Sequence, residues 1–132
     1  MLNYILVGLG SAAGGISRFW ASGVIANRYG SSFPWGTLFV NVTGSFIIAF
    51  FATMTDPEGR WLVAPNFRTF FMVGICGGYT TFSSFSLQTI NLLRDGERLH
   101  AGLNVLLSFT LCMLAAWLGH VAAATLRPKI GV

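Results

Sequence analysis

Charge is scarce in this chain of 132 residues: aspartate, glutamate, lysine and arginine together make up only 9% of it, whereas hydrophobic residues make up 54%. The mean hydropathy is +0.67. A soluble domain of this size could not hide so much apolar surface from water. The composition therefore excludes an ordinary soluble protein and predicts an integral membrane protein whose main solvent is lipid.

Acidic residues are the rarest charged type. The four of them, Asp56, Glu58, Asp95 and Glu97, fall in two short stretches, which marks those stretches as loops. The formal net charge is +4, but the basic residues are spread singly between apolar segments and form no run. A nucleic-acid partner is therefore not expected, and contact with lipid headgroups explains the basic excess better.

Cysteine is also rare, and a signal peptide is not predicted. Cys76 and Cys112 both lie inside apolar segments, so a disulfide framework is not expected. The first basic residue is Arg18, and the apolar stretch before it is rich in glycine and alanine rather than carrying the positive start of a removable signal. We therefore expect residues 1–26 to form a mature helix.

Four apolar stretches are long enough to cross the hydrocarbon core, which takes about 20 residues of helix. They cover residues 4–26, 35–54, 69–93 and 101–125. The connections between them are short, so neighbouring helices should run antiparallel and leave no room for a second domain. The sequence thus predicts an all-α fold of four transmembrane helices, a single domain over residues 1–132, with both termini on one side.

Basic residues are balanced between the two predicted sides of the membrane. The side of the termini carries Arg60, Arg68, Arg127 and Lys129, and the other side carries Arg28, Arg94 and Arg98, with Arg18 nearest to it. Orientation follows the Lys/Arg asymmetry between loops, so this balance predicts insertion in both orientations. Dual topology permits an antiparallel homodimer with its two-fold axis in the membrane plane.

Glycines recur at four-residue spacing in two spans, as Gly10 with Gly14 and as Gly74 with Gly78. Such spacing allows close helix contacts, and lipid-exposed glycine is the alternative.

In the third span Gly77-Gly78 is followed by six hydroxyl-bearing residues between positions 79 and 86. Broken backbone at membrane depth is tolerated only where it is buried in protein or lines a wet cavity. We predict a helix break around residues 77–81, whose freed carbonyl oxygens suit a cation.

Phe82 and Phe85 are three residues apart, so they share a face if the helix resumes after the break. The edges of their rings carry the positive part of the aromatic quadrupole and can face a dehydrated anion. A pair of packed core phenylalanines is the alternative. The flanking hydroxyls favour the anion-facing interpretation.

Polar side chains recur every four residues on the second and fourth spans. They are Thr37, Asn41 and Ser45 on the second, and Asn104, Ser108 and Cys112 on the fourth. Neutral donors of this kind can replace water around a small, strongly hydrated anion without trapping it. Hydrogen bonds between helices could also explain each of them, but their repetition on two helices favours a lined path.

Arg18 lies inside the first span, where a charge is costly enough to suggest a function. It could raise the local anion concentration in a vestibule, or its side chain could simply snorkel to the interface. Neither interpretation is favoured by the sequence.

Three other classes of protein fit the sequence less well. A small proton-coupled antiporter needs a carboxylate within the membrane, and no Asp or Glu lies in any predicted span. A purely structural assembly partner leaves the hydroxyl-rich break unexplained. An enzyme is not expected, because the spans contain no carboxylate pair, metal-ligand cluster or nucleophile with a base.

Two motifs resemble those of a known family. The run from Gly77 to Ser86 resembles the Fluc/CrcB signature GGxTTFSTFS, and the run from Gly36 to Gly44 resembles the GTxxxNxxG motif of its second helix. The resemblance covers essentially the whole chain. It implies a fluoride-selective channel in the cell inner membrane that exports fluoride from the cytoplasm by passive diffusion, built as a dual-topology homodimer with two pores.

The resemblance also implies roles for particular residues. Phe82 and Phe85 would face fluoride, and Asn41 would be a pore-lining donor. Six further residues would border the ion path: Thr37, Ser83, Ser84, Asn104, Ser108 and Cys112. The backbone carbonyls of Gly77 and Thr80 from each subunit would hold a structural sodium ion at the dimer interface.

This chain departs from the family pattern at three of these positions. Ser84 replaces a more usual Thr and keeps the hydroxyl. Asn104 stands where some relatives have Tyr, and Cys112 stands where many have Ser. A thiol is a weak donor, so the path along the fourth span is the part of the transfer that the sequence supports least.

Overall fold

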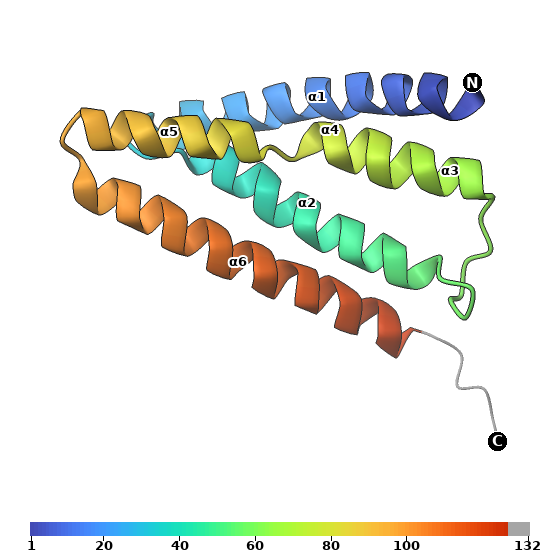
Figure 1. Cartoon of the computed structure of the whole chain (residues 1–132). Coiled ribbons are helices and arrows are strands. Elements are labelled where there is room, and N and C mark those ends of the chain that lie inside the picture. The colour runs from blue at the N-terminus through green and yellow to red at the C-terminus, as the bar shows by residue number, and fades with distance from the viewer. Residues whose placement is uncertain (127–132) are drawn as a thin grey trace.

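The computed structural model describes residues 1–126, and all regular elements in this part of the chain are helical. They are α1 (Leu2–Tyr29), α2 (Trp35–Met54), α3 (Pro65–Thr69), the π-helix η1 (Phe70–Cys76), α4 (Gly77–Tyr79), α5 (Phe82–Arg94) and α6 (Arg98–Thr125). The elements from α3 to α5 follow one another along one direction and together form the third long helix (Figure 1). The predicted all-α fold is confirmed, with α1, the third helix and α6 extending a few residues beyond the predicted bounds.

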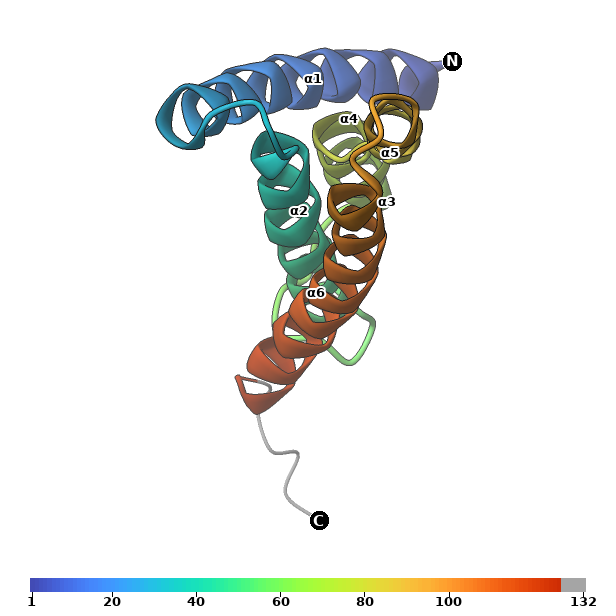
Figure 2. The ribbon, with the colours of Figure 1, turned by 90° about the vertical axis from the view of Figure 1, so that its left-hand side faces the viewer.

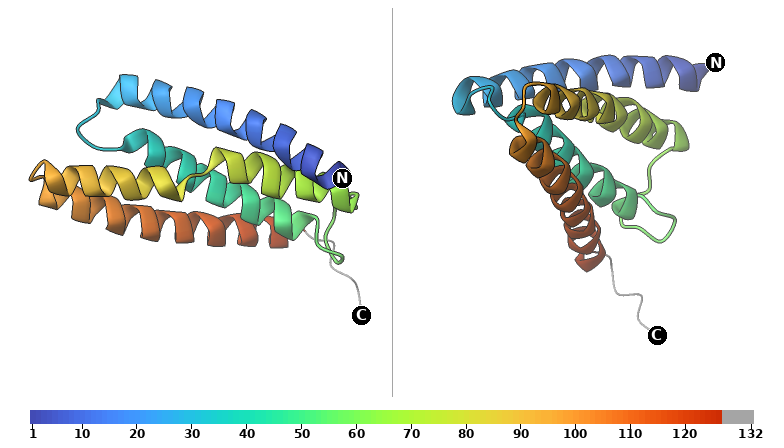
Figure 3. Two further views of the ribbon diagram at one scale, coloured as in Figure 1. Left: turned by 45° about the horizontal axis from the view of Figure 1, so that its top comes forward. Right: turned by 60° about the vertical axis from the view of Figure 1, so that its left-hand side comes forward.

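The third helix and α2 lie between α1 and α6 (Figure 2). The first half of the third helix, η1 and α4, packs against α1, whereas its second half, α5, packs against α6 (Figure 3). α2 contacts α1, α6 and both halves of the third helix. α2 therefore contacts each of the other long helices of the subunit.

Three helical segments are long and apolar enough to cross a membrane: Trp35–Met54, Pro65–Arg94 and Arg98–Thr125. α1 has 28 residues, about 42 Å at the rise of an α-helix, so it is long enough. Its apolar residues alternate with serines, glycines and Arg18, which lowers its hydropathy. The structure thus supports an all-helical membrane protein, and the transmembrane placement of α1 stays a prediction.

The basic residues separate to the two ends of the helices as predicted, as far as the structure describes them. Arg28, Arg94 and Arg98 lie at the end where α1 meets α2 and where α5 meets α6, and Arg60 and Arg68 lie at the opposite end. Arg127 and Lys129 lie outside the described residues. α1 begins, and α6 ends, at the same end of the molecule as Arg60 and Arg68 (Figure 1).

Large apolar side chains cover the outside of the subunit. On α1, Phe19 and Trp20 are 84% and 70% exposed, and on α6, Phe109 and Trp117 are 72% and 60% exposed. Such a surface is stable only against lipid or against another protein. The exposed apolar surface therefore agrees with the composition in indicating a membrane protein.

The predicted close helix contact occurs where α1 crosses the third helix. Gly10 lies against Gly74, and a Cβ on Gly10 would lie 2.8 Å from the Cα of Gly74 and 2.7 Å from the carbonyl oxygen of Phe70. Gly14 contacts Gly78 and Tyr79 in the same way, with a Cβ only 2.8 Å from the nitrogen of Tyr79. Gly10, Gly14 and Gly74 are buried, so lipid-exposed glycine, the alternative interpretation, is wrong for them.

Candidate functional site

The break in the third helix is confirmed, and it is shorter than predicted. Only Thr80 and Thr81 are extended, with ψ of 158° and 116°. Gly77 remains helical, with φ −64° and ψ −38°. A Cβ on Gly78 would lie 2.6 Å from the carbonyl oxygen of Ser11 on α1. This close contact, and not the break itself, explains why Gly78 has no side chain.

The backbone of Thr81 is held by a side chain of α2. The amide nitrogen of Thr81 donates to Oδ1 of Asn41 at 2.7 Å, and Nδ2 of Asn41 donates to the carbonyl oxygen of Thr81 at 3.0 Å. In an unbroken α-helix the Thr81 amide would donate to the carbonyl of Gly77 four residues earlier. The break therefore deprives the Gly77 carbonyl of its helical donor.

The Thr81 side chain starts the second half of the helix. Its Oγ1 accepts a hydrogen bond from the amide of Ser84 at 3.1 Å, which is an N-cap. The same hydroxyl donates to Oγ of Ser84 at 3.0 Å and lies 3.3 Å from Oγ of Ser83. Three hydroxyls are thus gathered at the N-terminus of α5, where the helix dipole is positive.

A cavity of about 510 Å³ lies beside the break, between α2, the third helix and α6. It is lined by many of the residues that the sequence singled out: Asn41, Ser45, Gly77, Thr80, Phe82, Phe85, Ser108 and Cys112. Val105, Phe109 and Met113 add apolar walls from α6. None of the lining residues carries a charge.

Phe82 and Phe85 share one face of α5, as their spacing predicts. Their ring centroids are 5.3 Å apart, with an angle of 50° between the ring planes, and both rings line the cavity. Phe82 is 78% exposed in the subunit. A packed core pair, which was the alternative, does not describe Phe82.

The two polar stripes divide between the cavity and the helix contacts. Ser45 lines the cavity, while its hydroxyl donates to the carbonyl of Asn41 at 2.7 Å. Asn104 is almost fully buried outside the cavity, where its Nδ2 donates to Oγ1 of Thr89 on α5 at 2.9 Å. Ser108 donates to Oδ1 of Asn104 at 3.4 Å. Hydrogen bonding between helices, which was the alternative interpretation, therefore describes Asn104, whereas Ser45 and Ser108 face the cavity.

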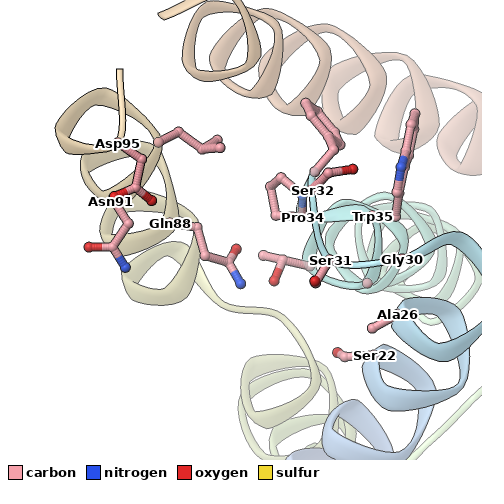
Figure 4. A pocket seen from close by; sticks show the side chains of 14 residues that line it. Ser22, Ala26, Gly30, Ser31, Ser32, Pro34, Trp35, Gln88, Asn91 and Asp95 are labelled. Atoms are coloured by element: carbon pink, nitrogen blue, oxygen red, sulfur yellow. The ribbon is translucent and has the colours of Figure 1, made fainter. Parts of the chain in front are cut away.

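A second cavity, of about 320 Å³, lies at the end of the subunit that carries Arg28 and Arg94. Thr37 lines this second cavity and not the one beside the break. Gln88 and Asn91 from α5, together with Asp95 directly after this helix, face the connection between α1 and α2 across it (Figure 4). Sequence reasoning missed this site, because its polar residues come from α1, α2, α5 and the loop between α1 and α2, and only the fold brings these segments together.

Arg18 reaches the break instead of pointing only toward the membrane surface. Its Nη1 lies 3.4 Å from the carbonyl oxygen of Thr80, and its side chain is partly buried. It is not among the residues that line either cavity. The guanidinium therefore places a positive charge beside the carbonyl end of α4, where the helix dipole is negative.

The carbonyls of Gly77 and Thr80 fit a hard cation. Both residues line the cavity beside the break, and the Gly77 carbonyl has lost its helical donor. A carbonyl oxygen has two lone pairs, so the long contact with Arg18 leaves Thr80 able to accept a second partner. Sodium prefers oxygen ligands of this kind, as other hard cations do.

The structure therefore defines a helical membrane protein with a helix broken beside an uncharged, partly aromatic cavity. Residues 5–120 match the family described as CrcB-like protein, Camphor Resistance (CrcB). The chain belongs to this family.

Relatives are similar over almost their whole length. The chain is 60% identical to a "Fluoride-specific ion channel FluC" of Opitutus terrae over 131 residues, covering 99% of each chain. It is 60% identical to one of Paramagnetospirillum magneticum, covering 96% of this chain and 99% of the relative, and 52% identical to one of Methylocella silvestris, covering 98% and 99%.

Proposed function

We propose that this protein is a fluoride-selective ion channel, not an enzyme, that lets fluoride leave the cytoplasm across the cell inner membrane by passive diffusion. The observation that carries the proposal is the cavity beside the break, whose lining combines three aromatic rings with hydroxyl, amide and thiol groups and contains no charged residue. The names of the relatives support fluoride as the ion.

The cavity chemistry suits a small anion. Removing fluoride from water requires donors that replace its hydration shell, and charged donors would bind it too tightly for rapid passage. Neutral hydroxyls and the positive edges of aromatic rings supply weaker, replaceable contacts. Phe82, Phe85, Asn41 and Ser108 are the residues to which we assign these contacts, with Ser83, Ser84 and Cys112 beside them.

Proton-coupled antiport remains the alternative that an experiment must exclude. Such a carrier needs a carboxylate that binds and releases a proton within the membrane. α1, α2, α5 and α6 contain no Asp or Glu, and neither does the first half of the third helix. This composition supports passive diffusion.

We further propose four transmembrane helices and an antiparallel homodimer. The near-equal numbers of arginines at the two ends favour insertion in both orientations, and the exposed apolar faces offer area for a second copy. In such a dimer the carbonyls of Gly77 and Thr80 would hold sodium, whose charge would offset the carbonyl dipoles where two breaks meet. In this proposal Arg18 attracts anions toward the pathway, and Thr37 lies at its mouth.

The test is flux from liposomes that contain purified protein and are loaded with fluoride or with chloride. Ion-selective electrodes should record rapid fluoride efflux and almost no chloride efflux, without an applied proton gradient. Comparable chloride efflux, or fluoride movement that requires a proton gradient, contradicts the proposal.

A further inference from the structure

Asn41 makes a contact that differs in kind from those of its polar neighbours. Its amide pairs with both backbone groups of one residue, Thr81, at 2.7 and 3.0 Å. The nearby hydroxyls of Thr43, Ser45 and Thr89 instead donate to a carbonyl of their own helix, four residues earlier. Asn41 is therefore the α2 side chain that substitutes for the missing backbone partners of the broken helix.

The direction of the Asn41 amide follows from the two contacts. Amide oxygen and nitrogen are assigned from their hydrogen-bond partners. The reverse orientation would place two donors together at the Thr81 nitrogen and two acceptors together at its oxygen. Only the observed orientation satisfies both backbone groups, which would otherwise lie unpaired beside an apolar cavity wall.

Two further residues of α2 hold the same segment. Oγ1 of Thr43 lies 3.0 Å from the hydroxyl of Tyr79, and Gly44 lies directly against the methyl group of Thr80 and the ring of Tyr79. Positions 79 to 81 are thus held one after another by positions 41 to 44. α5 begins directly after this segment, because Thr81 is its N-cap.

We propose that Asn41 is a positioning residue: its amide pairs with both backbone groups of Thr81, fixes the break, and thereby sets the direction in which α5 carries Phe82 and Phe85 into the cavity. Nδ2 carries two hydrogens and gives one to Thr81, so the other remains available to the cavity. The consequence for fluoride rests on the proposed function, but the positioning itself does not.

Two substitutions separate positioning from direct contact with the ion. In Asn41→Ser the side chain is too short to pair with both backbone groups of Thr81. Its hydroxyl should instead donate to a backbone carbonyl of its own helix, as that of Ser45 does. In Asn41→Asp the carboxylate still accepts from the Thr81 amide but offers no donor to its carbonyl. Asn104→Ser is the matched control, because Asn104 contacts the side chain of Thr89 and no backbone group of the break.

The readouts are taken without fluoride, so they do not depend on the ion that the channel carries. Amide-resolved hydrogen exchange in detergent micelles reports the Thr81 amide, and the ¹⁹F resonance of 4-fluorophenylalanine at position 82 reports the ring. In Asn41→Ser, exchange at Thr81 should be faster by roughly threefold to tenfold, and the ring resonance should shift or broaden. In Asn41→Asp the amide should stay protected, and Asn104→Ser should leave both signals as in the wild type.

The result that overturns the proposal is an Asn41→Ser protein with wild-type exchange at Thr81 and a wild-type ring resonance. If such a protein also lost fluoride flux, Asn41 would act only by contacting the ion, and the channel assignment would stand. Fast exchange at Thr81 in Asn41→Asp would equally contradict the pairing. Failure of the channel assignment would be seen separately, as wild-type protein that conducts no fluoride while the exchange pattern remains as expected.

Discussion

The crossing of α1 with the third helix provides a sharp test of the packing. In Gly14→Ala the added Cβ would lie 2.8 Å from the nitrogen of Tyr79 and would also meet the carbonyl oxygen of Ile75. The shortest ordinary contact is 3.4 Å, and the Ile75 oxygen is nearer than the Tyr79 nitrogen, so the two backbones must separate by more than about 0.6 Å. Neither partner is a flexible side chain that could move aside.

Gly8→Ala is the matched control, because a Cβ there meets nothing within 4 Å. Both alanines gain about 1 kcal/mol of helix propensity over glycine, so this gain cancels in the comparison. Overpacking costs about 1–3 kcal/mol, and Gly14→Ala should be less stable than Gly8→Ala by this amount.

Unfolding titrations in mixed micelles, followed by circular dichroism, measure the difference in stability. Because Gly14 contacts the residues directly before the break, fluoride flux should also fall in Gly14→Ala and persist in Gly8→Ala. Equal stability of the two variants would refute the close packing of α1 against the third helix.

Four other outcomes are expected. Phe82→Ile and Phe85→Ile keep apolar bulk but remove the ring edges, so liposome flux of fluoride should collapse while size exclusion still shows a folded dimer; wild-type flux in both would return the rings to a packing role. Thr81→Val removes the N-cap and should lower the free energy of unfolding by about 1 kcal/mol, whereas Thr81→Ser should be nearly neutral; equal losses would exclude the cap. Complete replacement of sodium by a larger cation should abolish wild-type flux, and unchanged flux would argue against the Gly77 and Thr80 site. Two or three lysines added near the N-terminus should bias orientation and reduce functional dimers, and termini accessible from one side only in the unmodified protein would disprove dual topology.

The sequence predicted the position of the break well because glycines and hydroxyl-bearing residues mark it in the local composition. Glycines and hydroxyl-bearing residues at membrane depth weaken a helix whatever lies around them, and the break fell within the expected five positions. The prediction that Gly77 and Gly78 themselves form part of the break was only partly right. Gly78 stays helical, and it has no side chain because α1 crosses it closely. A contact between segments that are distant in the sequence cannot be predicted from local composition.

The polar stripes show the same limit. Four-residue spacing correctly placed each stripe on one helix face, but it could not say what that face meets. α2 passes both cavities, so Thr37 and Asn41 lie in different ones. Asn104 meets Thr89 on α5 because α5 and α6 are adjacent. The π-helix η1 was also not predicted, since its sequence is as apolar as that of an ordinary span.

The break places a negative helix end close to a positive helix end, and the two ends face different groups. The carbonyl end of α4 is negative, and it is there that Arg18 approaches Thr80 and that we place sodium. The amide end of α5 is positive, and it presents the hydroxyls of Ser83 and Ser84 together with the ring of Phe82. A continuous helix would cancel these charges along its length, whereas two extended residues expose both. A break held by Asn41 therefore offers an anion a favourable helix terminus at membrane depth without placing a charged side chain in its path.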